Sequence, residues 1–287
     1  MAAVATFNAA TPLMRTVLFV PGSRPERFAK ALAAGADAVI IDLEDAVEPD
    51  RKAAARDHIR DFVDQGGGAA DTRFMVRVND ATTQWFADDL ALCAQLPSVS
   101  AVVLPKAETA DHVVQAFATG KPVLPIVENA QGVLSLSQLA AAPGVVRLSF
   151  GSLDFMLELG TTPDTEAAHG LLEHVRYQIL MHSAANGLAQ PLDGVFPDFS
   201  DTERLHAHAQ HIRHMGFGGM LCIHPAQIAP IHAAFAPSAA EREWAQRVVD
   251  IADRTGSSAF QVDGKMVDVP VIRRARQIVA MGNNATA

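Results

Sequence analysis

Short runs of apolar residues recur along this 287-residue chain, and amphipathic stretches separate them. The runs lie at 15–20, 37–42, 73–78, 101–104, 122–127, 146–150, 191–195 and 220–223. Runs of this kind are typical of parallel strands that are buried on both faces. The stretches between them predict helices at 25–34, 50–64, 84–94, 109–118, 131–140, 164–186, 201–214 and 225–235. Eight strands, each followed by a helix, predict a (β/α)8 TIM barrel. No GxGxxG motif follows the first run, which disfavours an open doubly wound sheet.

The length of the chain leaves a segment beyond the barrel. We expect residues 1–14 to form a disordered tail and residues 15–235 to form the barrel, which would be the catalytic domain. Residues 236–287 should form a C-terminal helical extension that packs on the barrel or on a neighbouring subunit. Within it the pattern predicts a helix near 238–255, a short hairpin or loop, and a last helix at 270–280.

Composition and charge exclude several classes of partner. A net charge of −9 argues against nucleic acid, which binds to a basic protein surface. No run reaches the roughly 20 apolar residues that span a bilayer, so we expect no membrane partner. The first residues lack the features of a secretory signal, and the cysteines at 93 and 222 have no metal or redox spacing. These features favour a reduced, cytoplasmic location.

Polar residues close nearly every apolar run, and three of them are informative. Arg77 lies near the end of the third run, Glu128 follows the fifth, and Asp154 follows the sixth. Barrel enzymes keep their active sites at these carboxyl ends, so the three side chains should gather. Two carboxylates with open positions suit Mg²⁺, and the lack of an accompanying His/Cys set disfavours zinc. The alternative for each acid is a helix cap or an ion pair with an arginine.

Arg77 lies inside an apolar run and therefore requires an anionic partner. Its guanidinium can hold a substrate carboxylate with two hydrogen bonds, or it can pair with Glu44 or Asp45, which follow the second run. Both arrangements can hold at once. Asp42 is a candidate buried structural acid, whereas Glu44 or Asp45 could contact a metal through water. Lys106 after the fourth run either binds an anion or caps the barrel.

Nine segments in order resemble one known family. They are RTVLFVPGSRPERFAKA, ADAVIIDLEDAVEPDRKAAAR, VRVN, VVLPK, IVEN, FGSLDF, PLDGVFPDFSD, GFGG and CIHPAQI, and DGKMVDVP adds a further match. Together they resemble the citrate lyase β-subunit-like family, within the superfamily of Mg²⁺-dependent acyl-CoA lyases and 2-keto-acid aldolases. The resemblance implies a modified TIM barrel, usually a homotrimer. It also implies an enzyme that makes or breaks a carbon–carbon bond between acetyl-CoA and a 2-keto acid.

The resemblance also assigns residues. It implies Glu128 and Asp154 as the Mg²⁺ ligands, with Glu128 also facing the substrate, and Arg77 as the residue that binds the substrate carboxylate. A catalytic aspartate from a neighbouring subunit corresponds to Asp268, with Asp263 as the second choice. The CoA-binding segment corresponds to the first strand and helix, which contain Arg15, Phe19, Pro21 and Lys30. We therefore expect Arg77, Asp268 and Glu44 to serve catalysis, and Arg15 and Lys30 to bind substrate.

One position departs from the family pattern. Relatives commonly carry a lysine in GFxGK, where this chain has Met220 after Gly219. The expected activity is Mg²⁺-dependent cleavage or condensation of citryl-CoA, malyl-CoA or citramalyl-CoA. One alternative is a class II aldolase on free 4-hydroxy-2-keto acids, but that branch uses an early histidine and this chain has none before His58. Another alternative is a lyase subunit that requires an acyl-carrier partner.

Overall fold

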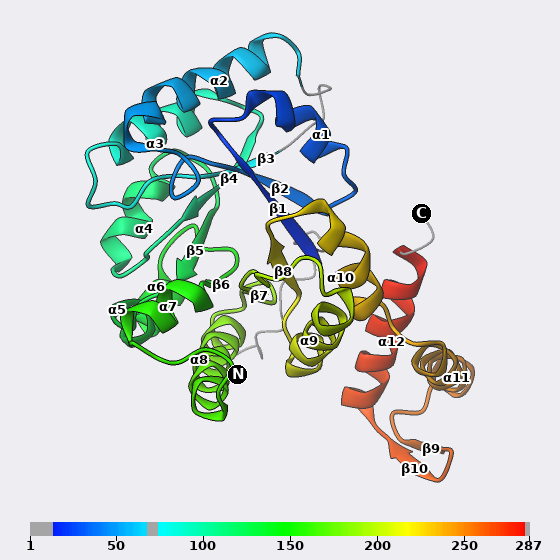
Figure 1. Ribbon diagram of the computed structural model, residues 1–287. Helices are drawn as coiled ribbons and strands as arrows, with labels where there is room; N and C mark the ends of the chain where they lie inside the picture. Colours follow the sequence, from blue (N-terminus) through cyan, green and yellow to red (C-terminus); the bar gives the residue numbers. More distant parts are fainter. Residues whose placement is uncertain (1–13, 68–73, 285–287) are drawn as a thin grey trace. The chain divides into compact units, whose positions relative to one another are not determined.

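The computed structural model describes residues 14–67 and 74–284, and eight parallel strands close into a barrel (Figure 1). The strands are β1 (Thr16–Pro21), β2 (Ala38–Asp42), β3 (Phe74–Arg77), β4 (Val99–Leu104), β5 (Val123–Val127), β6 (Ser149–Phe150), β7 (Leu192–Asp193) and β8 (Gly219–Cys222). β1 pairs with both β2 and β8, which closes the sheet. The prediction of a TIM barrel is confirmed. All but the last residue of the predicted tail lies outside the described residues.

The helices follow the strands in chain order and lie outside them (Figure 1). They are α1 (Phe28–Leu32), α2 (Lys52–Asp64), α3 (Phe86–Gln95), α4 (Ala110–Phe117), α5 (Ala130–Leu134), α6 (Leu136–Ala141), α7 (Ser152–Glu158), α8 (Glu166–Ala185), α9 (Thr202–Met215) and α10 (Ile228–Phe235). The single helix expected at 131–140 is two helices, because the chain turns at Ser135. The pattern did not predict α7. No helix in the described part is long and apolar enough to cross a membrane.

The interior of the barrel is filled by apolar side chains that alternate along the strands. The barrel core contains Val17, Ile40, Met75, Ala101, Val103, Leu124, Ile126, Leu192 and Leu221. Successive side chains of a strand point to opposite faces, so every second residue faces this core. Continuing the alternation toward the carboxyl ends brings Phe19, Asp42 and Arg77 to the same inner face. Glu128 follows Ile126 in the same way.

The two ends of the sheet meet closely at Gly219. A Cβ atom at this position would lie 1.9 Å from the carbonyl oxygen of Met14 and 2.7 Å from the Cα of Arg15. The amide of the next residue, Met220, donates to the carbonyl of Arg15 at 3.0 Å. Only glycine therefore lets β8 approach β1 at this point, and the closure of the barrel depends on it.

Residues 235–287 form a separate compact unit, so the chain divides after Ala234. The unit contains α11 (Ala239–Thr255), the antiparallel pair β9 (Phe260–Val262) and β10 (Lys265–Val267), and α12 (Val269–Asn284). Ser238 and Glu241 form a capping box at the start of α11. An apolar core of its own holds the unit together, and Ala245, Val248 and Ala275 are its fully buried members.

We predict opposite effects from two glycine-to-alanine changes. Gly219→Ala should destabilise the fold by about 1–3 kcal/mol, because the new methyl group overlaps backbone atoms that cannot move freely. Gly170 lies on the exposed face of α8, where a Cβ would meet nothing within 4 Å. Gly170→Ala should therefore stabilise the fold by about 0.5–1 kcal/mol. Urea unfolding of both variants checks the pair, and equal midpoints would contradict the argument.

Candidate active site

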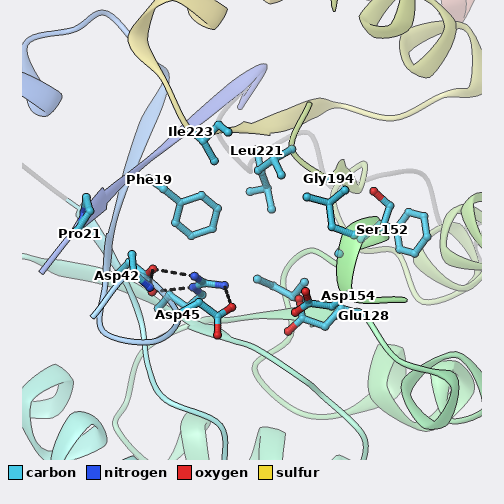
Figure 2. Close-up of a pocket in the computed structure, with 17 residues that line it drawn as sticks. Phe19, Pro21, Asp42, Asp45, Glu128, Ser152, Asp154, Gly194, Leu221 and Ile223 are labelled. Carbon is cyan, nitrogen blue, oxygen red and sulfur yellow. Dashed lines mark hydrogen bonds and ion pairs between the residues drawn. The ribbon is translucent and has the colours of Figure 1, made fainter. Parts of the chain in front are cut away.

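A cavity of about 430 Å³ opens at the carboxyl ends of the barrel strands (Figure 2). Its polar lining includes Asp42, Asp45, Arg77, Glu128 and Asp154. Apolar side chains complete the wall, among them Phe19, Ile126, Phe150, Val195, Leu221 and Ile223. The alternation of the strands explains part of this composition, because Phe19, Asp42, Arg77, Glu128 and Ile223 each stand one step beyond a barrel-core residue of the same run.

Arg77 is held by a two-pronged ion pair with Asp42. Its Nε donates to Oδ1 at 2.7 Å and its Nη2 donates to Oδ2 at 2.7 Å. The remaining nitrogen, Nη1, lies 2.9 Å from Glu44 Oε2 and 3.5 Å from Asp45 Oδ2. The guanidinium carbon lies 4.8 Å from the centre of the Phe19 ring, a cation–π distance. The internal ion pair considered from the sequence is therefore present, but its main partner is Asp42.

Glu44 connects Arg77 to Lys106. The Glu44 carboxylate is buried, with Arg77 on one side and the ammonium of Lys106 on the other. Burial raises the pKa of Glu44 to about 7, although both cations lower it. We call residues 42–45, which carry three acids, the acidic loop. The negative charges of this loop are balanced mainly by the side chains of Arg77 and Lys106.

Lys106 also orients Glu128 through its backbone. Its φ angle of +46° is in the left-handed region, which a residue with a Cβ atom rarely adopts. This conformation lets the Lys106 N–H donate to Glu128 Oε1 at 2.7 Å, while the side chain reaches Glu44. One strained residue therefore contacts two carboxylates of the site.

Glu128 is buried with an incomplete balance of charge. Its exposed fraction is 5%, and burial together with the negative charge of Glu44 raises its pKa to about 8. Gly151 makes room for it, because a Cβ there would lie 2.4 Å from Glu128 Oε2. Gly151 was not predicted as part of the site, although a glycine directly after the sixth strand was the available signal.

Asp154 lies in the first turn of α7 and lines the cavity beside Glu128 (Figure 2). The expected approach of Arg77, Glu128 and Asp154 to a single cavity is therefore seen in the fold. In the described part of the chain, no three His, Cys, Asp or Glu side chains gather into a metal-binding group. A cation between Glu128 and Asp154 would thus keep positions open for water or substrate, which fits a hard divalent ion such as Mg²⁺.

The structure does not bring Arg15 and Lys30 to this cavity. Arg15 precedes β1, at the amino end of the barrel, and its Nε and Nη2 pair with Asp37 at 3.0 and 2.9 Å. Lys30 is exposed on α1. Met220 is buried and alternates with Leu221 of the barrel core, so position 220 faces away from the cavity. A lysine there would not reach the cavity wall.

Asp268 belongs to the second unit. It is half-buried directly before α12, where its carboxylate accepts the N–H of Val271 at 3.3 Å. Asp263 lies in the turn between β9 and β10 and pairs with Arg247 at 2.7 Å. Within its own unit, Asp268 acts as a helix cap.

We predict that the backbone strain at position 106 can be measured as stability. Lys106→Gly and Lys106→Ala both remove the ammonium and keep the N–H that Glu128 accepts. The glycine variant should be more stable than the alanine variant by about 1 kcal/mol, because only glycine tolerates the left-handed conformation. Urea unfolding gives the difference, and equal stability would show that the residue relaxes out of this conformation.

Comparison with known proteins shows the same family that the segments indicated. Residues 15–225 match the model of the HpcH/HpaI aldolase/citrate lyase family. The chain is similar to a citrate lyase subunit beta-like protein of Mycobacterium tuberculosis, with 37% identity over 273 residues that cover 94% of this chain and 96% of the relative. It is also similar to a (3S)-malyl-CoA thioesterase of Cereibacter sphaeroides, with 37% identity over 274 residues that cover 93% of each protein.

Solved structures agree with these sequence matches. CitE from Mycobacterium tuberculosis, in complex with magnesium, acetoacetate and coenzyme A, superposes with a TM-score of 0.83 at 36% identity, covering 94% of this chain and 98% of that one. The citrate lyase beta subunit of the same organism, complexed with oxaloacetate and magnesium, has a TM-score of 0.70 at 37% identity, covering 78% and 98%. The chain belongs to the HpcH/HpaI aldolase/citrate lyase family and is an enzyme of the lyase class.

Proposed function

We propose that this chain is a Mg²⁺-dependent carbon–carbon lyase acting on a 3-hydroxyacyl-CoA such as malyl-CoA, citramalyl-CoA or citryl-CoA. The observation that carries the proposal is the meeting of Glu128, Asp154 and Arg77 in one cavity at the barrel mouth. The products would be acetyl-CoA and a 2-keto acid, or the substrates in the reverse direction. Relatives solved with magnesium, coenzyme A, oxaloacetate and acetoacetate support this class of ligand.

Glu128 and Asp154 would hold the Mg²⁺ ion. Both donors are carboxylate oxygens, which Mg²⁺ prefers, and the buried Glu128 lacks a full counter-charge in the structure. When bound, Mg²⁺ would lower the pKa of the substrate hydroxyl and polarise the ketone that forms. Lys106 keeps Oε1 of Glu128 in a hydrogen bond, and this fixes the orientation of the carboxylate.

Arg77 would bind the carboxylate of the keto-acid half. Asp42 holds the guanidinium in place, so the arginine is oriented before substrate arrives. In cleavage, the substrate hydroxyl would lose its proton to water and become the carbonyl of the keto acid as the carbon–carbon bond breaks. Its electron pair passes to the thioester half as an enolate, and a proton added to carbon gives acetyl-CoA.

We assign that proton transfer to Asp268, supplied by a neighbouring subunit of a homotrimer. The assignment rests on the DGKMVDVP segment, which resembles the corresponding C-terminal segment of the family. A carboxylate can serve as acid in cleavage and as base in condensation. Catalysis would then require the assembled protein.

A second candidate activity is hydrolysis of malyl-CoA to malate and CoA. The similarity to (3S)-malyl-CoA thioesterases, at 37% identity over 274 residues, favours it. In hydrolysis, water attacks the thioester carbonyl and the thiolate of CoA leaves, so no keto acid forms. The two reactions therefore differ in their products, although both would use the same cavity.

A product assay on the purified chain tests these proposals. Malyl-CoA, citramalyl-CoA, citryl-CoA, free 4-hydroxy-2-keto acids and a thioester-loaded carrier protein are supplied separately with Mg²⁺ and again with EDTA. Keto acid, acetyl-CoA and free CoA are measured. Metal-dependent keto acid with acetyl-CoA supports the lyase, and free CoA without keto acid supports the thioesterase. Turnover only of free 4-hydroxy-2-keto acids would indicate a class II aldolase. Turnover only with a thioester-loaded carrier protein would indicate a subunit that needs a partner.

We predict that two acids on α7 behave differently. Asp154→Asn should lower metal-dependent kcat/KM by about 100-fold or more, because a neutral amide is a poor Mg²⁺ ligand. Glu158, one helical turn later, accepts the N–H of Ala130 at 2.7 Å, and Gln can keep that hydrogen bond. Glu158→Gln should therefore retain wild-type turnover. Steady-state kinetics over a Mg²⁺ titration checks both, and normal turnover by Asp154→Asn would exclude it as a ligand.

We predict a similar contrast in the second unit. Asp268→Asn should reduce kcat by about 100-fold while leaving the oligomer unchanged, because it removes the proton-transfer group. Asp263→Asn, which removes an exposed ion pair, should keep activity. Kinetics together with light scattering measures both properties. Loss of activity in Asp263→Asn alone would move the assignment to that residue.

A further inference from the structure

Lys52 is a buried lysine behind the acidic loop. It is the first residue of α2, and its exposed fraction is 5%. Its ammonium donates to two consecutive backbone carbonyls of the loop, that of Leu43 at 2.8 Å and that of Glu44 at 2.7 Å. The ring of Trp85 lies 5.4 Å from the same nitrogen. A lysine this deeply buried is rare unless its charge is specifically satisfied.

Burying the ammonium of Lys52 costs free energy, and these contacts must offset that cost. Burial lowers its pKa, and the negative charges of Asp42 and Glu44 act in the opposite direction. The ammonium donates two of its three hydrogens to the loop carbonyls, so its positive charge lies directly against the backbone of the acidic loop. An apolar side chain such as that of Met would leave both carbonyls without these donors.

The front of the loop carries the groups that contact Arg77. Leu43 N–H donates to the Arg77 carbonyl at 2.9 Å, and the Glu44 N–H donates to Asp42 Oδ1 at 2.9 Å. The Glu44 side chain then lies between Arg77 and Lys106. Lys52 therefore holds the carbonyl groups of Leu43 and Glu44. The N–H groups of the same two residues contact Arg77 and Asp42, and so align the guanidinium. Moving these backbone groups would shift Asp42 and Glu44 relative to Arg77.

Charge leads to the same conclusion. With every group ionised, the three acids of the loop exceed by one the charges of Arg77 and Lys106 that pair with them. Lys52 supplies the missing positive charge from the interior side. Without it, the loop would repel an anionic substrate that approaches Arg77.

We propose that Lys52 is a positioning residue that sets the acidic loop, and through it Arg77, in the geometry that binds the substrate carboxylate. The proposal rests on the lyase function proposed above for its kinetic consequence. Its structural half, the fixing of the loop, is independent of any substrate.

The test compares Lys52→Met with Lys121→Met. Lys121 is a half-buried lysine that also donates to a backbone carbonyl, that of Leu96 at 3.1 Å, but it precedes β5 at the amino end of the barrel. Hydrogen exchange is measured by mass spectrometry on the peptide that covers residues 43–48. Lyase kinetics are measured at a temperature well below unfolding of either variant.

In Lys52→Met, amide exchange in residues 43–48 should accelerate by about ten-fold or more, and kcat/KM should fall by about 10- to 100-fold. Lys121→Met should change neither. Unchanged exchange of the loop in Lys52→Met, or faster exchange spread evenly over the barrel, would overturn the proposal. If Lys52→Met is insoluble, Lys52→Arg decides: its bulkier group should give a smaller increase confined to the same peptide. The exchange result stands even if the wild-type chain turns over none of the thioesters offered.

Discussion

The two-residue alternation of the barrel strands is the constraint on which the site depends. The same inward-facing positions that carry Ile40, Met75 and Ile126 in the core carry Asp42, Arg77 and Glu128 one step further. Core and site are therefore successive layers of one stack. If one of these strands shifted by one residue, its polar side chain would turn toward the surrounding helices. A neighbouring side chain would take its place at the cavity. The packing of the core thus sets the geometry of the site.

Placing acids and cations at the top of such a core has an energetic consequence. A buried charge is tolerated only when it is paired, so the buried charged groups near the cavity are held by others. Asp42 takes two nitrogens of Arg77, and Glu44 lies between Arg77 and Lys106. Glu128 is the exception, since one backbone N–H is its direct partner and burial keeps its pKa high. Ion pairs therefore fix the guanidinium of Arg77, whereas the negative charge of the buried Glu128 carboxylate is only partly balanced.

Much of this could be predicted from the sequence, because strand ends are visible in it. The apolar runs indicated the barrel, and the residues that close them indicated Arg77, Glu128 and Asp154. The main partner of Arg77 was not identified, since Asp42, Glu44 and Asp45 are close together in the sequence and only the strand register shows that Asp42 lies opposite Arg77. The left-handed backbone of Lys106 and the space at Gly151 depend on three-dimensional contacts. The backbone of Lys106 leaves no signal in a hydrophobic pattern, and a glycine after the sixth run does not name the side chain that approaches it.

The two sides of the cavity are constrained differently. On the polar side, Asp42 and Arg77 continue the barrel core and are joined by ion pairs that extend to Glu44 and Lys106, so changing any one of these four disturbs others. Leu153 and Ile223 are on the exposed rim, where their exposed fractions are 41% and 45%. A substitution there alters the shape of the cavity without opening the core. One methyl group in such a pocket changes selectivity by about 1–3 kcal/mol, so a substitution on the rim should change which ligand fits the cavity while the ion pairs on the polar side stay intact. The shape of the cavity and the arrangement of its charges can thus vary separately, because exposed rim residues determine the first and ion pairs beside the core determine the second.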